Sequence, residues 1–228
     1  MNRMHKTLAA LTAAFLGNIA LPAHAAIIIA EVDPSASGNT SYAGDWFELT
    51  NTGASTVDIT DWRMDDNSNS CGLSRALSGV TSIAPGQSVV FIETADLPTK
   101  RDAFVASWFG GVAPAGFTVG SYSGAGVGLS TGGDAVNVFD GVGALITRID
   151  FGASTTNVSF DNAAGFGDVL VSQLSVVGVN GAFLGTDAAH IETGSPGTVC
   201  AVPVPGPRGC SAARSVSARC AVVAPAEA

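Results

Sequence analysis

The stretch from Asp58 to Asn69 contains the residues best suited to bind a metal ion. It reads DITDWRMDDNSN and repeats carboxylate and amide oxygens after a short β-branched run. The oxygen-bearing residues are Asp58, Asp61, Asp65, Asp66, Asn67 and Asn69. Hard oxygen ligands on a loop after a strand are what Ca²⁺ takes, commonly six to eight of them. Because the spacing is not that of an EF-hand loop, the sequence predicts weak Ca²⁺ binding at most.

These acidic residues have two other interpretations. At the edge of a sheet, they would be surface charge that discourages pairing with another chain. A glycosidase instead needs two carboxyl groups about 5–10 Å apart across a cleft, a separation that the sequence does not give. Asp33, Asp45 and Glu48 could add Ca²⁺ ligands if their strands are neighbours. Because acidic and aromatic residues alternate in GDWFELTN and DWRMDD, we predict half-buried strands whose acids lie mainly on wet faces and turns.

A second group of residues has types that could support nucleophilic catalysis. Residues 128–132 read GLSTG and fit G-x-S-x-G, in which a strand-to-helix turn exposes the serine, here Ser130. His190 is the only histidine after residue 25. The residues that follow the motif, GDAVNVFD, alternate as a strand does, so the required helix is missing. We therefore predict a hairpin turn without catalytic residues, and we expect that the protein is not an enzyme.

The three tryptophans, Trp46, Trp62 and Trp108, admit two interpretations. Exposed, they would be platforms on which sugar rings stack. Large aromatic side chains on alternating strands are readily buried, however. We therefore predict that all three belong to the core.

Short strands separated by glycine-rich turns must position these residues. Only Leu97–Phe109 is expected to be helical, since Pro98 suits a first turn, apolar residues recur at helical spacing and Gly110-Gly111 ends the segment. A strand, a turn at residues 84–86 and a second strand are expected within Val80–Glu93. Further strands are predicted at Ile27–Pro34, Asp45–Asn51, Val57–Ile59, Asp61–Asp65, Phe117–Ser121, Val127–Ser130, Ala135–Phe139, Leu145–Phe151, Val158–Phe160 and Val169–Val179. This pattern indicates an all-β antiparallel sandwich with one short helix.

The N-terminal residues are typical of a secretory signal. Arg3 and Lys6 give a positive start, Leu8–Leu21 form a short apolar run, and small residues lead to a predicted cleavage site after Ala25. We therefore expect an exported protein, in the periplasm, at the cell surface or outside the cell, with no membrane span in the mature chain. The full chain has 10 Lys and Arg against 19 Asp and Glu. Such an acidic protein repels phosphate backbones, so nucleic acid is excluded as a partner.

Four cysteines and a proline-rich tail complete the chain. Export permits disulfides, and Cys71, Cys200, Cys210 and Cys220 can pair in three ways that the sequence does not rank. None of the spacings is C-x-x-C, so a zinc site is not indicated. Residues 200–228 contain several prolines and no usable periodicity, so we predict that they are disordered.

The order and spacing of several pieces of sequence indicate a family. They read IIIAEVDP, GDWFELTNTGASTVDITDWRMDD, SIAPGQSVVFIE, GVGLSTGGDAVNVFD, ALITRIDFG, SVVGVNGAF and GSPG, between Ile27 and about Gly197. In these pieces the chain resembles the lamin-tail domain family in its bacterial, secreted form. The resemblance implies an immunoglobulin-like β-sandwich without established catalytic residues, over a domain of residues 26–199. It also implies an accessory module of surface and secreted proteins.

The tail is similar to a bacterial sorting signal in one place. Val202–Pro205 read VPVP where a PEP-CTERM signal has Val-Pro-Glu-Pro. No apolar helix follows, and Arg208, Arg214 and Arg219 are dispersed instead of clustered. We interpret the tail as a degenerate PEP-CTERM-like signal in a shifted reading frame, a hypothesis that resequencing the gene would test.

Together these features predict a non-catalytic, exported binding or scaffold module. It would act at the cell surface or in the extracellular matrix, with a cell-surface protein or a polysaccharide as partner. One alternative is a Ca²⁺-dependent carbohydrate-binding module, for which the tryptophans would have to be exposed. The other is a secreted hydrolase that uses Ser130 or an acid pair. Apart from weak Ca²⁺ binding, we expect no cofactor.

Overall fold

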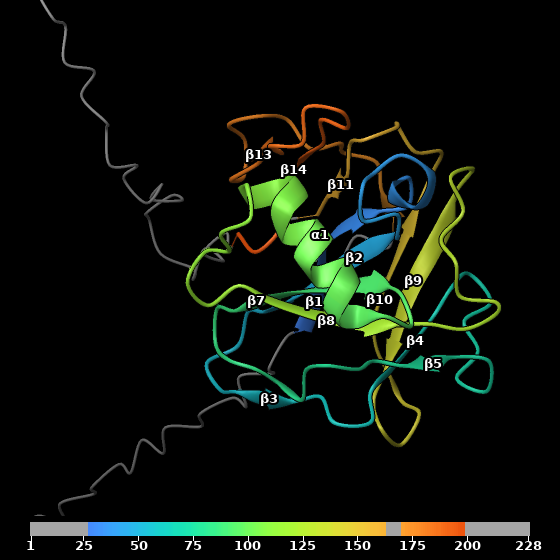
Figure 1. The fold of residues 1–228 in the computed structure, drawn as a ribbon. Helices are drawn as coiled ribbons and strands as arrows, with labels where there is room; N and C mark the ends of the chain where they lie inside the picture. Colours follow the sequence, from blue (N-terminus) through green and yellow to red (C-terminus); the bar gives the residue numbers. More distant parts are fainter. Residues whose placement is uncertain (1–26, 163–169, 199–228) are drawn as a thin grey trace, which may run out of the picture.

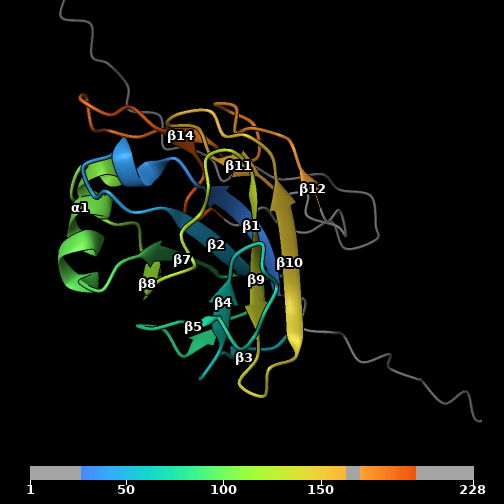
Figure 2. The ribbon, with the colours of Figure 1, turned by 90° about the vertical axis from the view of Figure 1, so that its right-hand side faces the viewer.

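Two five-stranded sheets pack face to face, and a helix covers the outer face of the first sheet (Figure 1). The computed structural model describes residues 27–162 and 170–198. In Figure 2 the helix, the first sheet and the second sheet follow one another as three layers. The predicted signal and the predicted tail lie outside the described residues.

The first sheet has the strand order β11-β1-β2-β7-β8. Its strands are β1 (Ile27–Asp33), β2 (Trp46–Asn51), β7 (Ser88–Glu93), β8 (Thr118–Tyr122) and β11 (Phe160–Asp161). β1, β2 and β7 are antiparallel neighbours, whereas β7 and β8 are parallel. A parallel pair needs a crossover connection, and α1 (Leu97–Phe109) lies in it.

The second sheet has the strand order β12-β10-β9-β4-β5. Its strands are β4 (Arg63–Asp65), β5 (Arg75–Ala76), β9 (Asp134–Phe139), β10 (Leu145–Phe151) and β12 (Leu170–Val171). Two short pairs join β3 (Val57–Asp58) to β6 (Ser82–Ile83), and β13 (Phe183–Leu184) to β14 (Thr193–Gly194). A 3-10 turn, η1 (Ala36–Gly38), follows β1.

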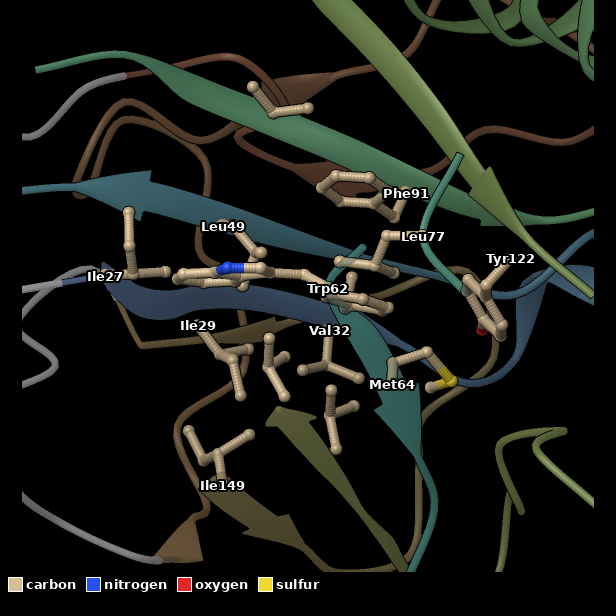
Figure 3. Packing of buried hydrophobic residues seen from close by; sticks show 14 of the residues in the cluster. Ile27, Ile29, Val32, Leu49, Trp62, Met64, Leu77, Phe91, Tyr122 and Ile149 are labelled. Atoms are coloured by element: carbon tan, nitrogen blue, oxygen red, sulfur yellow. The ribbon is translucent and has the colours of Figure 1, made fainter. Parts of the chain in front are cut away.

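The main core fills the space between the two sheets. Its side chains come from alternate positions of the long strands, as the pleat of a strand requires. Phe47 stacks on Phe91 with ring centroids 5.6 Å apart, and Figure 3 shows Trp62 and Met64 entering from β4 and its flank. Trp62 and Met64 are two residues apart in the sequence, and they therefore project to the same side of the chain, toward the core.

A second apolar cluster lies between the first sheet and α1. Trp46 from β2 meets the helix residues Phe104 and Trp108 in edge-to-face contacts at 5.7 and 6.0 Å between ring centroids. The helix starts where Asp96 caps Thr99, and it ends at Gly110, whose φ of 64° few other residues adopt. All three tryptophans are buried, so their assignment to the core is confirmed.

The structure confirms the bounds predicted for the helix and for β10, and corrects three other predictions. Residues 127–130 form no strand, and of the predicted strand at 169–179, whose first residue is not described, only Leu170–Val171 belong to a named strand. The sheets are not purely antiparallel, since β7–β8 and β10–β12 are parallel. Each correction concerns pairing, which depends on neighbours that are distant in the sequence.

Candidate functional site

The outer face of β1 and β2 carries a buried pair of glutamates. A β-bulge between Ile29 and Glu31 shifts the alternation of β1, so that Glu31 pairs directly with Glu48 of β2. Residues paired in this way project to the same side of a sheet. Glu31 and Glu48 are each only 1% exposed. The prediction that the acids of GDWFELTN and DWRMDD lie mainly on wet faces is therefore wrong for Glu48, and Glu31 is buried opposite it.

The segment that buries the two glutamates is the last part of the described chain. Glu31 Oε1 accepts hydrogen bonds from Ser195 N at 2.8 Å and from Ser159 Oγ, and Glu31 Oε2 accepts one from Ser195 Oγ at 3.1 Å. Glu48 Oε2 accepts a hydrogen bond from Gly197 N. The GSPG stretch at 194–197 is thus fastened to the first sheet by two carboxyl groups.

The electrostatics of this pair follow from its burial. Burial raises the pKa of Glu31 to about 7, against hydrogen bonds from Ser159 and Ser195 that lower it. Burial, and then the charge of Glu31, raise the pKa of Glu48 well above its ordinary value. Two like charges facing each other in a poorly solvated space cannot both ionise cheaply. The pair therefore retains protons near neutral pH.

A third buried carboxyl group extends the same system toward α1. Tyr42 donates its hydroxyl hydrogen bond to Glu192, and Trp46 Nε1 donates to the Tyr42 oxygen at 3.0 Å. Burial, followed by the charge of Asp33, raises the pKa of Glu192 to about 8, although the hydrogen bond from Tyr42 lowers it. This chain of contacts connects the C-terminal segment to the aromatic cluster under the helix.

Asp33 and Asp45, the other acids considered as Ca²⁺ ligands, are also buried. Asp33 Oδ1 accepts from the backbone and the hydroxyl of Ser35, both at 2.8 Å. Asp45 accepts from Ser37 N at 2.8 Å, and burial raises its pKa to about 7. These two carboxylates hold the loop around η1 against the ends of β1 and β2.

An open groove lies beside the glutamate pair. It has a volume of about 250 Å³ and is lined by residues 85–88, residues 114–117 and Gly197. The turn at residues 84–87 is built by Pro85 and by Gly86 at a φ of 72°, the arrangement of a type II turn. We call this cavity the Gly197 groove. Ligand pockets commonly measure 300–1,000 Å³, so the groove is suited to one small group of a larger partner.

The walls of the Gly197 groove combine apolar and polar groups. Pro85, Pro114 and Phe117 supply apolar surface. Gln87 Nε2 donates to Thr118 Oγ1 at 3.1 Å, which ties the two sides together below the opening. Gly197, whose amide is held by Glu48, contributes a wall that a side chain would fill. A Cβ there would lie 2.5 Å from the Phe117 ring.

The residues predicted to bind Ca²⁺ lie at the ends of β3 and β4 and in the loops that follow these strands. Asp58 is exposed, and its pKa is lowered by a hydrogen bond from the Thr60 side chain and by one from Thr60 N at 2.9 Å. Asp65 is buried, and its Oδ2 accepts from Ser68 Oγ and Ser70 N, both at 2.6 Å. Asp66 Oδ1 accepts from Ser68 N at 3.0 Å. Most of these oxygens therefore order the chain locally.

The other three candidate ligands have no shared centre with them. Asp61 and Asn69 are turn residues with positive φ, and Asn67 donates its backbone N–H to Asp134 at 3.0 Å. Within residues 27–162 and 170–198, no group of three or more His, Cys, Asp or Glu is placed to hold a metal ion. Calcium binding by Asp58–Asn69 stays a prediction.

Ser130 and His190 occupy unrelated places. Ser130 lies in the turn before β9, where its N–H donates to Asp134 at 2.8 Å and its Oγ accepts from Gly132 N. His190 Nδ1 lies 3.2 Å from Asp187 Oδ2, and no hydrogen bond connects it to Ser130 in the described part of the chain. Ser41 is also near His190, but it donates directly to Asp187. This arrangement lacks the relay of a catalytic triad, in which the histidine lies between serine and acid.

Cys71 is the one predicted disulfide partner that the structure describes. It is partly exposed and forms no disulfide with another described residue. Cys200, Cys210 and Cys220 lie outside the described residues, so the pairing stays open.

Two packed sheets and one α-helix in the described residues, with the pieces of sequence quoted above in their order, agree with an immunoglobulin-like domain. A family model described as Lamin Tail Domain matches residues 21–153, more than half of the chain. The protein belongs to the lamin-tail domain family. This family consists of immunoglobulin-like domains that are not enzymes. No curated protein matches the chain.

The lamin-tail domain of this protein is completed by residues beyond the matched range. The GSPG stretch lies after residue 153 but is bonded to Glu31 and Glu48, which lie within the match. In residues 27–162 and 170–198, no helix has the length and apolar character that a membrane span requires.

Sequence reasoning missed the glutamate pair, although its signal was present in two glutamates on adjacent strands and a later serine- and glycine-containing turn.

Proposed function

We propose that this lamin-tail domain is an exported, non-catalytic binding or scaffold module that contacts a partner at the cell surface or in the extracellular matrix. Membership of a family without enzymatic activity supports a binding role. The observation that carries the proposal is the Gly197 groove, an open depression lined by apolar residues and by the polar Gln87 and Ser88. The N-terminal residues 1–25, which have the pattern of a secretory signal, support export.

The groove favours a protein segment over a polysaccharide. Carbohydrate-binding sites use exposed aromatic rings as platforms, but Trp46, Trp62 and Trp108 are all buried. The groove instead offers Pro85, Pro114 and Phe117, which suit an apolar side chain or a proline of an extended peptide. Its volume of about 250 Å³ limits the contact to one or two such groups. The remaining affinity would come from the surrounding loops.

The test is retention of a cell-envelope partner by the full chain, compared with a variant whose groove is filled. Ala115 is exposed on the groove wall, so Ala115→Trp blocks the opening without removing a buried contact. Ala144→Trp is the matched control, because Ala144 is an exposed alanine in the turn between β9 and β10 of the second sheet. We expect the native chain and the control to retain the same partner, and the groove variant to lose it.

Three results would contradict this proposal. Equal retention by the Ala115→Trp variant would show that the groove does not contact the partner. Turnover of ester or glycoside substrates, lost in Ser130→Ala, would show that the protein is a hydrolase. Release of the bound material by a polysaccharide, instead of by a peptide, would reassign the groove to glycan.

A further inference from the structure

We propose that the Gly197 groove is regulated by protons, through a carboxyl clamp that releases the C-terminal segment when Glu31 and Glu48 ionise. The carboxyl clamp consists of Glu31 and Glu48 together with Ser195 and Gly197, whose groups they bind. The proposal rests on the groove being the binding site proposed above, and it concerns the regulation of that site. At acidic to neutral pH the clamp is closed, and above neutral pH it opens.

The two glutamates of the carboxyl clamp are neighbours and bind the same short segment of chain. Glu31 and Glu48 are cross-strand partners on β1 and β2, brought to one face by the bulge in β1. Their bonds go to residues two apart in the segment, Ser195 and Gly197. Because the segment contributes one wall of the groove through Gly197, its release removes that wall.

The groups around the clamp are acidic on every side that packs against it. Asp33 lies on β1, Asp161 on β11 faces Glu31, and Glu192 lies on the C-terminal segment itself. The neutral donors are Ser159, Ser195 and the backbone of Gly197, with Ser88 of β7 beside Glu48. Among the described residues, none of the hydrogen bonds or ion pairs of Glu31 and Glu48 comes from Lys, Arg or His. Ionisation therefore adds negative charge that no Lys, Arg or His of the described residues compensates by a hydrogen bond or ion pair.

The size of the effect follows from the shift of Glu31. Burial raises the pKa of Glu31 from 4.5 to about 7. If release returns this carboxyl group to water and to its ordinary value, the opening constant of the segment rises about 70-fold between pH 5 and pH 8 from Glu31 alone. Glu48 acts in the same direction, since burial and the charge of Glu31 also raise its pKa.

Hydrogen–deuterium exchange of the full chain tests the clamp. Exchange of residues 192–198 is measured at pH 5 and pH 8 and expressed relative to the free-chain rate at each pH. We expect the protection of this segment to fall by tens of fold at pH 8, and we expect β9 in the second sheet to stay better protected than the segment. The Glu31→Gln/Glu48→Gln variant keeps a hydrogen-bond acceptor at each position but cannot ionise there, so its protection should fall much less than that of the native chain, and the fall that remains comes from Glu192. Asp58→Asn, which alters an exposed acid, is the control and should behave as the native chain.

Three outcomes would overturn the proposal. The first is protection of residues 192–198 that does not change between pH 5 and pH 8 in the native chain, a result that needs no variant to fold. The second is an equal fall in the double glutamine variant. The third is exchange of β9 at the same rate as the segment, since this would mean global unfolding. If the groove retains a partner but the protection of residues 192–198 does not change with pH, only the proposal of a carboxyl clamp is refuted. If this protection falls at pH 8 but no partner binds, only the proposed function is refuted.

Discussion

Replacement of Gly194 by alanine tests whether the C-terminal segment is packed as tightly as its contacts indicate. A Cβ at this position would lie 2.5 Å from Glu31 Oε1, 2.9 Å from Ser159 Oγ and 2.9 Å from the Trp108 ring. All three neighbours are buried. Distances below 3.0 Å cannot be kept, so the segment or its neighbours must move.

The expected cost has two parts. Inserting a methyl group into a filled space typically costs about 1–3 kcal/mol. Displacing Glu31 from Ser195 and Ser159 leaves buried polar groups unpaired, at about 1–3 kcal/mol more. A loss of about 2–6 kcal/mol in the free energy of unfolding is therefore expected. In a domain of this size it lowers the midpoint of thermal unfolding by roughly 4–24 °C.

Gly152→Ala is the matched control for this change. No atom lies within 4 Å of a Cβ at Gly152, and its backbone needs no positive φ. Alanine should there be neutral, or stabilise by up to about 1 kcal/mol through the unfolded chain. Urea titrations of the native chain and both variants, followed by tryptophan fluorescence, measure the three free energies. If Gly194→Ala were as stable as Gly152→Ala, the close packing of residues 193–195 on Glu31 and Trp108 would be refuted.

Three further predictions concern the buried acids and the discarded sites. Raising the pH from 5 to 8 should lower the free energy of unfolding by about 2.5 kcal/mol from Glu31 alone. The reason is that the pKa of Glu31 is about 7 in the folded chain and 4.5 ordinarily, so the unfolded chain releases this proton at lower pH. Urea titrations that show rising stability over this range would contradict the prediction. Tyr42→Phe leaves Trp46 Nε1 and Glu192 without their shared partner and should cost about 1–3 kcal/mol, measured in the same way. Ser130→Ala should change neither fold nor any hydrolytic background, and a loss of turnover in an ester assay would reverse that expectation.

Much of the fold could be predicted from local sequence. The β-branched run that starts at Ile27 predicted β1, and a short stretch between glycine-rich turns, Leu145–Phe151, predicted β10. The helix was predicted with its ends, since Pro98 and Gly110 mark them by their backbone preferences. The central position of Trp46, Trp62 and Trp108 followed from their size.

The pairing of strands and the environment of the acids could not be predicted in this way. Residues 127–130 have strand-like composition but no partner, so they form no ladder. The parallel alignment of β7 and β8 depends on how α1 returns the chain to the sheet. The period of two in β2 is real, but it does not reveal whether the second face meets water or another segment.

The sequence by itself determined most of the long strands, the helix and the family, because these depend on residue preferences over short stretches and on the order of the pieces. Only the tertiary structure decided that Glu31 and Glu48 are buried opposite each other. That outcome requires a bulge in β1 and a segment more than 140 residues further along the chain, which covers the face that alternation alone would leave in water. Burial is a property of what packs against a residue, and for these two carboxyl groups the packing partner is remote in sequence.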